Sequence, residues 1–161
     1  MKFSGFLAPL VLLGFFLALV VAGFFISQSN LGRSTEYKQA KVVIKEETFS
    51  VDIADRSAEQ RQGLSGRASL GANEGMIFIF KDSRYQSFWM KGMKIPIDII
   101  WIKGETIIGF EKNVQPESGV NMLRLRTYSS PEAVEKVLEV PAGTVERLDI
   151  QVGDKAVLSY N

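Results

Sequence analysis

The stretch that decides the fold is Ser87-Phe88-Trp89-Met90-Lys91-Gly92-Met93-Lys94-Ile95-Pro96-Ile97-Asp98-Ile99-Ile100-Trp101-Ile102. It contains two runs rich in β-branched and aromatic residues, which is typical of strands. A short link containing Gly92 and Pro96 joins them. The stretch predicts two strands joined by a turn.

Three side chains in these runs are difficult to place beside so much apolar surface. Neighbouring side chains of a strand point to opposite faces, so Trp89 and Lys91 share one face and Asp98 opposes Ile97 and Ile99. A lone buried charge costs several kcal/mol, so Lys91 and Asp98 are expected to be either hydrated or paired. If the sheet curls, the three side chains could line one pocket and offer an aromatic platform, a cation and an acceptor.

The same stretch carries a family resemblance together with four other blocks. They are Gly63-Leu64, Glu74-Gly75-Met76-Ile77-Phe78, Leu138-Glu139-Val140-Pro141-Ala142-Gly143 and Val152-Gly153-Asp154. In this order the blocks resemble the uncharacterised prokaryotic family called domain of unknown function 192, over about residues 42 to 159. The family usually has Asn and Thr where this chain has Gly92 and Met93, so any polar contact from those side chains is missing. The resemblance implies a compact barrel-like fold and no established activity.

The first residues differ from the rest of the chain. No charge interrupts residues 3–26, and a helix of that length reaches about 36 Å, enough to cross a hydrocarbon core of about 30 Å. We therefore predict a membrane anchor or signal sequence over residues 1–27, with a cleaved signal peptide and a buried soluble helix as the alternatives. A flexible tether over residues 28–40 and a globular domain over residues 41–161 complete the predicted organisation.

The predicted orientation rests on two opposing arguments. Arg33, Lys38 and Lys41 follow the apolar run closely, and counting positive residues would keep the domain in the cytoplasm. Members of the resembled family often look exported or membrane-anchored, and a short cytoplasmic tail is normal for a signal anchor. We expect a single-pass membrane protein with an extracytoplasmic domain, or export after signal cleavage.

Composition narrows the chemistry. The chain has no histidine and no cysteine, so the usual ligands of zinc, copper and haem are missing, and we expect neither a metal site nor a cofactor. Without Lys2 the chain carries equal numbers of basic and acidic residues, so no net field points to nucleic acid. The expected partners are the bilayer, through the N-terminal helix, and a small ligand or an envelope protein.

The remaining pattern predicts six or seven short strands and two short helices. Ser57 and Gln60 have the spacing of a capping box for a helix that ends near Gly63 or Gly66, and residues 141–149 predict a second helix. Residues 76–80 are apolar on both faces and predict a central covered strand. The predicted class is α+β, with a strongly curved, mostly antiparallel β-sheet or β-barrel preceded by one transmembrane helix.

Further candidate site residues lie in segments that match the resembled family. Arg67, Glu74 and Tyr128 could converge on Trp89, Lys91 and Asp98. Structural interpretations compete with this one: Trp89 as a core residue, Lys91 with Asp98 as an ion pair, and Arg67 with Glu74 as a clamp across a turn.

The favoured function is binding of a small polar ligand or a protein partner, because every catalytic motif tested is missing. One alternative is an envelope hydrolase or transferase acting on carbohydrate, with Asp98 or Glu74 as acid or base and Lys91 holding an anion. The other is a non-catalytic structural or assembly module.

Overall fold

The computed structural model describes residues 37–160. The chain divides into two units between Glu36 and Tyr37, and the second unit contains every described residue. The predicted anchor over residues 1–27 and most of the predicted tether lie outside the described residues. Within residues 37–160, no helix has the length and apolar character needed to cross a membrane.

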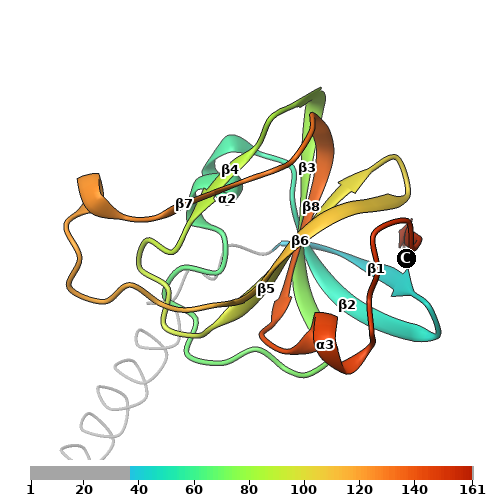
Figure 1. The fold of residues 1–161 in the computed structure, drawn as a ribbon, viewed down its shortest axis with the longest axis horizontal. Coiled ribbons are helices and arrows are strands. Elements are labelled where there is room, and N and C mark those ends of the chain that lie inside the picture. Colours follow the sequence, from blue (N-terminus) through green and yellow to red (C-terminus); the bar gives the residue numbers. More distant parts are fainter. Residues whose placement is uncertain (1–36, 161) are drawn as a thin grey trace, which may run out of the picture. The chain divides into compact units, whose positions relative to one another are not determined.

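A single curled sheet forms the centre of the domain (Figure 1). Its seven strands lie in the order β6, β5, β8, β3, β2, β1, β9. Their bounds are β1 Lys38–Ile44, β2 Glu47–Ala54, β3 Glu74–Arg84, β5 Ile97–Lys103, β6 Thr106–Val114, β8 Val134–Pro141 and β9 Ala156–Tyr160. Strand β1 begins three residues before the predicted start of the domain at Lys41.

Neighbouring strands are antiparallel except β2 and β3, which pair in parallel and are connected through the helix α2, Ser57–Gln62. The two edge strands approach each other, since Thr106 at the start of β6 forms an isolated bridge with Lys155 just before β9. The amide of Ala156 also donates to the carbonyl of Glu105 at 2.8 Å. The predicted curved, mostly antiparallel sheet with two short helices is confirmed.

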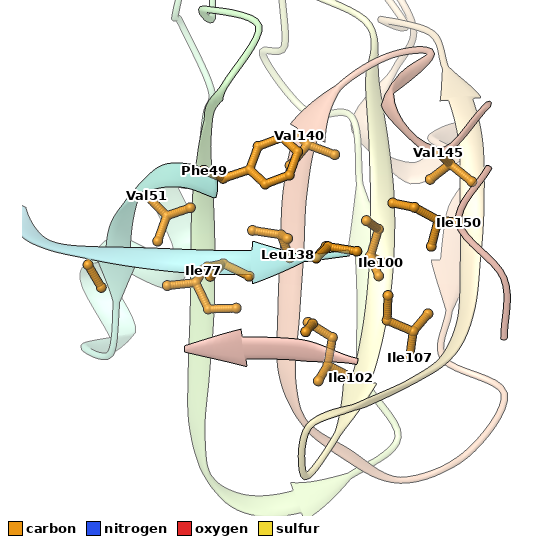
Figure 2. Close-up of a cluster of buried hydrophobic side chains, with 14 of the residues drawn as sticks. Phe49, Val51, Ile77, Ile100, Ile102, Ile107, Leu138, Val140, Val145 and Ile150 are labelled. Atoms are coloured by element: carbon orange, nitrogen blue, oxygen red, sulfur yellow. The ribbon is translucent and has the colours of Figure 1, made fainter. Parts of the chain in front are cut away.

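Buried side chains fill both faces of this sheet. Strand β5 alternates between them: Ile100 and Ile102 belong to one core cluster, and Ile97, Ile99 and Trp101 to the other. Figure 2 shows the first cluster, in which side chains of β2, β3, β5, β6 and β8 gather with Val145 and Ile150. Each fully buried aliphatic side chain contributes roughly 1.5–3 kcal/mol, so the two clusters dominate the stability of the domain.

The first half of the opening stretch does not join the main sheet. Strand β4, Ser87–Trp89, pairs with β7, Thr127–Ser129, in a separate two-stranded ribbon. The 3-10 helix η1, Met122–Arg124, precedes β7 in a long loop that projects from the sheet in Figure 1. The two runs therefore form strands, as predicted, but these strands do not pair with each other.

The ends of the short helices test the local predictions. The N-cap of α2 is Arg56 rather than Ser57, and Glu59 reaches back to the Arg56 amide at 3.1 Å, so the predicted box lies one residue too late. Gly63 ends the helix with φ 51°, as predicted. The second helix, α3, spans Thr144–Arg147, and Asp149 follows it in the left-handed conformation with φ 47°.

Candidate functional site

A pocket of ≈ 120 Å³ lies where α2, the turn after it, strands β3 and β8, and the ribbon strand β4 meet. We call it the Glu139 pocket. Its lining is Gln60, Arg61, Gln62, Gly63, Leu64, Ser65, Phe78, Phe80, Gln86, Ser87, Phe88, Trp89, Lys91, Met93 and Glu139. In Figure 1, α2 and β4 lie next to each other, to the left of β3 and β8. Segments far apart in the sequence thus form one pocket.

The turn after α2 brings backbone close to the inner part of the pocket. Gly63 adopts a left-handed φ of 51°, which costs a residue with a side chain more than it costs glycine. A Cβ added there would lie 3.4 Å from Cζ of Phe78 and 4.0 Å from Oε2 of Glu139. Glycine at this position therefore lets the backbone turn out of the helix and pass close to the side chains of Phe78 and Glu139.

Glu139 lies in the middle of the sheet. It pairs with Met76 of β3 on one side and with Ile99 of β5 on the other, so its side chain shares their apolar face. The residue is only 5% exposed, and its Oε2 atom has no hydrogen-bond partner. Desolvation disfavours the charged form and raises the pKa of Glu139 to about 8, although the positive charge of Arg67 acts in the opposite direction. At neutral pH this carboxyl is mostly protonated.

Gln86 supplies a second unpartnered polar group to the same pocket. Its backbone is well held: the amide donates to Oγ of Ser130 at 3.0 Å, and the carbonyl accepts from the Ser130 amide at 2.9 Å. Its side-chain nitrogen is buried without a partner. Among residues 37–160, Glu139 and Gln86 hold the two buried side-chain atoms that lack one, and both residues line the Glu139 pocket.

Aromatic rings form part of the pocket wall. Phe88 packs edge-on against Phe78 with ring centroids 4.8 Å apart, and against Trp101 at 5.7 Å. Trp89 is 52% exposed, and Nζ of Lys91 lies 5.9 Å from the centroid of its ring. An apolar floor, two buried polar groups and an exposed indole beside a cation are the features of a small-ligand site.

The structure brings together only part of the predicted site. Trp89 and Lys91 both line the pocket, and Trp89 is exposed rather than a core residue, so its core interpretation is wrong. Asp98 is fully buried on the opposite face of the sheet. Its carboxylate accepts from the amides of Asn113 at 2.7 Å, Val145 at 2.8 Å and Gly143 at 3.2 Å. The predicted shared pocket and the Lys91–Asp98 ion pair are both wrong, because backbone donors satisfy Asp98.

The other three predicted residues lie elsewhere. Arg67 forms an ion pair with Asp52 rather than with Glu74, and Glu74 accepts from the Gly71 amide at 2.8 Å, so the predicted clamp is wrong. Tyr128 is buried on β7, with the guanidinium of Arg126 4.8 Å from its ring centroid. None of the three lines the Glu139 pocket, although the charge of Arg67 acts on Glu139.

The sequence contained a signal for one of the two missed residues. Glu139 stands in the run Val137-Leu138-Glu139-Val140, where a charged residue interrupts a strand that is apolar on both faces. Such a residue is either paired or functional. Gln86 gave no comparable signal, because a polar residue beside Ser87 is ordinary in a loop.

The donor set of the described residues does not favour a metal. No group of three or more histidine, cysteine, aspartate or glutamate side chains gathers within residues 37–160 in a way that could hold a metal ion. Glu139 is the one carboxylate in the lining of its pocket.

A family match covers nearly the whole described domain. The model of the family DUF192, described as Uncharacterized ACR, matches residues 40–158. The chain belongs to this family. No curated protein matches the DUF192 chain closely enough to add a function.

Two solved structures resemble this DUF192 chain. A protein of Sinorhizobium meliloti 1021, described as a candidate transcription regulator, is 30% identical, with a TM-score of 0.68 over 76% of this chain and 95% of that one. A protein of unknown function from Novosphingobium aromaticivorans DSM 12444 is also 30% identical, with a TM-score of 0.65 over 74% of this chain and 83% of that one. Nearly all of the first relative corresponds to three quarters of this chain.

Proposed function

We propose that the DUF192 domain of this chain is a binding domain that takes one end of a small polar ligand into the Glu139 pocket. The observation that carries the proposal is the pair of buried, unpartnered side-chain atoms of Glu139 and Gln86, two residues that line one pocket. An unsatisfied buried polar group costs roughly 1–3 kcal/mol, and a ligand that hydrogen-bonds to both groups would recover that energy on binding. The exposed indole of Trp89 and the ammonium of Lys91 provide further contact area at the edge.

The pocket size supports recognition of a group rather than of a whole large molecule. Pockets for drug-sized ligands measure roughly 300–1,000 Å³. The Glu139 pocket, at ≈ 120 Å³, is smaller. A ligand would therefore insert one functional group and leave the rest against Trp89 and Lys91. The same arrangement suits the end of a flexible chain or a sugar of the cell envelope.

The proposal also places the domain outside the cytoplasm on an N-terminal membrane anchor. Support comes from the uncharged run over residues 3–26 and from the balanced charge of the domain. Removing Lys2, Arg33 and Glu36 from totals of 19 basic and 18 acidic residues leaves equal numbers. A domain without net positive charge lacks the electrostatic attraction that nucleic-acid binding needs. A reporter fused after Asn161 that is active only in the cytoplasm should be silent, and an active reporter would reverse the orientation.

The test of binding is a ligand screen on residues 37–161 by nuclear magnetic resonance. Hits should shift the amide signals around Glu139, Gln86 and Trp89 in the wild type and should be lost in both Glu139→Leu and Gln86→Leu. Leu123→Ala serves as the control, because Leu123 is 90% exposed in the projecting loop and does not line this pocket. Hits that persist in both pocket variants would contradict the proposal.

A second candidate function is favoured by one observation. A carboxyl with a pKa near neutrality inside a pocket is typical of a general acid, and the pKa of Glu139 is raised to about 8. Glycoside hydrolysis, however, ordinarily needs two carboxyl groups roughly 5–9.5 Å apart. Glu139 is the one carboxylate lining its pocket, while Asp98 and Glu74 lie elsewhere. Turnover of an envelope carbohydrate that Glu139→Gln abolishes would replace binding by catalysis.

A further inference from the structure

We propose that the ligand group recognised by the Glu139 pocket is the acetamido group of an N-acetylated amino sugar, whose ring stacks on Trp89. This inference rests on the proposed function, because it names the ligand class of the same pocket. It is carried by the hydrogen-bonding capacity of the two buried groups, by the charges around them and by the size of the pocket.

The two unpartnered groups call for a ligand that accepts hydrogen bonds. The protonated Glu139 carboxyl has an O–H donor, and the amide nitrogen of Gln86 offers donors as well. An acetamido group matches them, because its carbonyl oxygen has two lone pairs and can accept from both. Its methyl group would then lie against the rings of Phe78 and Phe88, which line the same pocket.

The surrounding charges favour a neutral group over a cation. Arg61 and Lys91 line the pocket, and Arg67 is the charged residue that acts on Glu139 from beyond it. Arg67 is paired with Asp52, but Arg61 and Lys91 are positive at the pocket itself, so an entering ammonium would meet like charges before it reached Glu139. Burial also keeps Glu139 mostly uncharged at neutral pH, since its pKa is raised to about 8. The inner end of the pocket therefore offers a cation no full countercharge.

The acetamido group and the sugar ring would occupy different parts of the site. A space of ≈ 120 Å³ is enough for an acetamido group. We place the ring at the edge of the pocket, where Trp89 presents an indole that is 52% exposed. An aromatic face of this kind buries the C–H face of a sugar while the ring hydroxyls stay in water.

Three probes that share one ring test the inference on residues 37–161: N-acetylglucosamine, glucosamine and glucose. At pH 7 we expect N-acetylglucosamine to bind about 10- to 100-fold more tightly than either of the others, because each of those leaves the buried groups unpaired. Gln86→Leu and Trp89→Ala should each weaken binding about tenfold or more, whereas Leu123→Ala should leave it unchanged.

The pH profile and one conservative variant complete the test. Wild-type affinity for N-acetylglucosamine should fall about tenfold per pH unit above 8, as Glu139 ionises and loses its donor. Glu139→Gln keeps a neutral donor and acceptor, so it should bind within about threefold of the wild type and lose the pH dependence. A structural role for Glu139 would produce neither change.

Each other outcome overturns the inference in a distinct way. Glucosamine binding that strengthens with pH and disappears in Glu139→Gln would identify a cationic ligand instead. Equal binding of glucose and N-acetylglucosamine would show recognition of the ring alone. If none of the three binds while the broader screen finds hits that need Glu139, this inference fails and the proposed function stands. If the screen is also empty, both fail.

Discussion

Two buried carboxylates, Asp98 and Glu139, lie on the neighbouring strands β5 and β8 and face opposite sides of the sheet. Asp98 is 0% exposed and accepts hydrogen bonds from three backbone amides. Glu139 is nearly as buried, yet its Oε2 has no partner. Two carboxyl groups that are similarly buried therefore differ in hydrogen bonding: Asp98 has partners for its charge, and Oε2 of Glu139 has none.

The difference separates a group that holds the fold from a group that is available to a ligand. Asp98 ties the end of β6 and the start of α3 to β5, and its burial is offset by those hydrogen bonds. Burial of Glu139 has no such compensation within the domain, and such positions in native proteins call for an explanation. Binding of a ligand that supplies the missing partner is the explanation that the pocket supports.

The largest effect is expected when Asp98 is removed. Asp98→Ala leaves three backbone amides without their buried acceptor, and we expect a loss of roughly 3–5 kcal/mol in the free energy of unfolding. Chemical denaturation of residues 37–161 measures it. Asp82→Ala is the matched control, because Asp82 is an exposed carboxylate in an ion pair with Arg84, and it should stay within about 0.5 kcal/mol. Equal losses in the two variants would remove the structural role of Asp98.

Glu139→Gln should show the opposite behaviour, with a gain that depends on pH. The pKa of Glu139 is raised from its ordinary 4.5 to about 8, so folding favours its protonated form and wild-type stability falls as the pH rises between these values. Glutamine has no such penalty. The variant should gain roughly 3 kcal/mol relative to the wild type between pH 5 and pH 8, as urea unfolding at several pH values would show. If the stability of the wild type and of Glu139→Gln changed with pH in the same way, Glu139 would not be a buried carboxyl that folding keeps neutral.

Glu59 is a buried carboxylate whose pKa is lowered, so the pH dependence of its contribution to stability is opposite to that of Glu139. The hydrogen bond from the Arg56 side chain lowers the pKa of Glu59 below its ordinary 4.5, against the effect of desolvation, and the Arg56 amide also donates to it. Its contribution is therefore present above pH 4.5 and is lost as the pH falls through the lowered value. Glu59→Gln should cost about 1 kcal/mol at pH 7 and progressively less in acid, by thermal melting. A loss that is constant with pH would show that shape matters here, not charge.

The smallest effect is expected at Gln86. Because its side-chain nitrogen has no partner, Gln86→Leu removes no hydrogen bond and relieves an unpaired buried group, so it should lower the free energy of unfolding by no more than about 0.5 kcal/mol. Ser130→Ala is the companion variant. It removes the oxygen that accepts from the Gln86 amide at 3.0 Å and should cost about 1–2 kcal/mol. A large loss in Gln86→Leu would mean that its amide supports the fold.

Much of the fold was predictable because local patterns and tertiary packing agree. The covered central strand and the glycine cap at Gly63 both follow from residue type and periodicity. The separate ribbon of β4 and β7 was not predictable, because Ser87–Trp89 has strand character but nothing in its sequence names its partner strand.

The candidate site was predictable only in part. Alternation placed Trp89 and Lys91 on one face, and both line the Glu139 pocket. Alternation could not show that Asp98 lies beside the start of α3. From the sequence alone, an aspartate that binds backbone amides cannot be told from an aspartate in a binding site. Glu139 carried a signal as the charged residue in an apolar run, whereas Gln86 depends on a contact with Ser130 that is 44 residues away.

The most direct test of the unpartnered, neutral Glu139 is the titration of its carboxyl by carbon-13 magnetic resonance, assigned with Glu139→Gln. We expect a titration midpoint near pH 8, because the buried group has no partner to stabilise its charge. A midpoint near the ordinary value of 4.5 would show a carboxylate that is charged and solvated at neutral pH, and it would contradict the central claim.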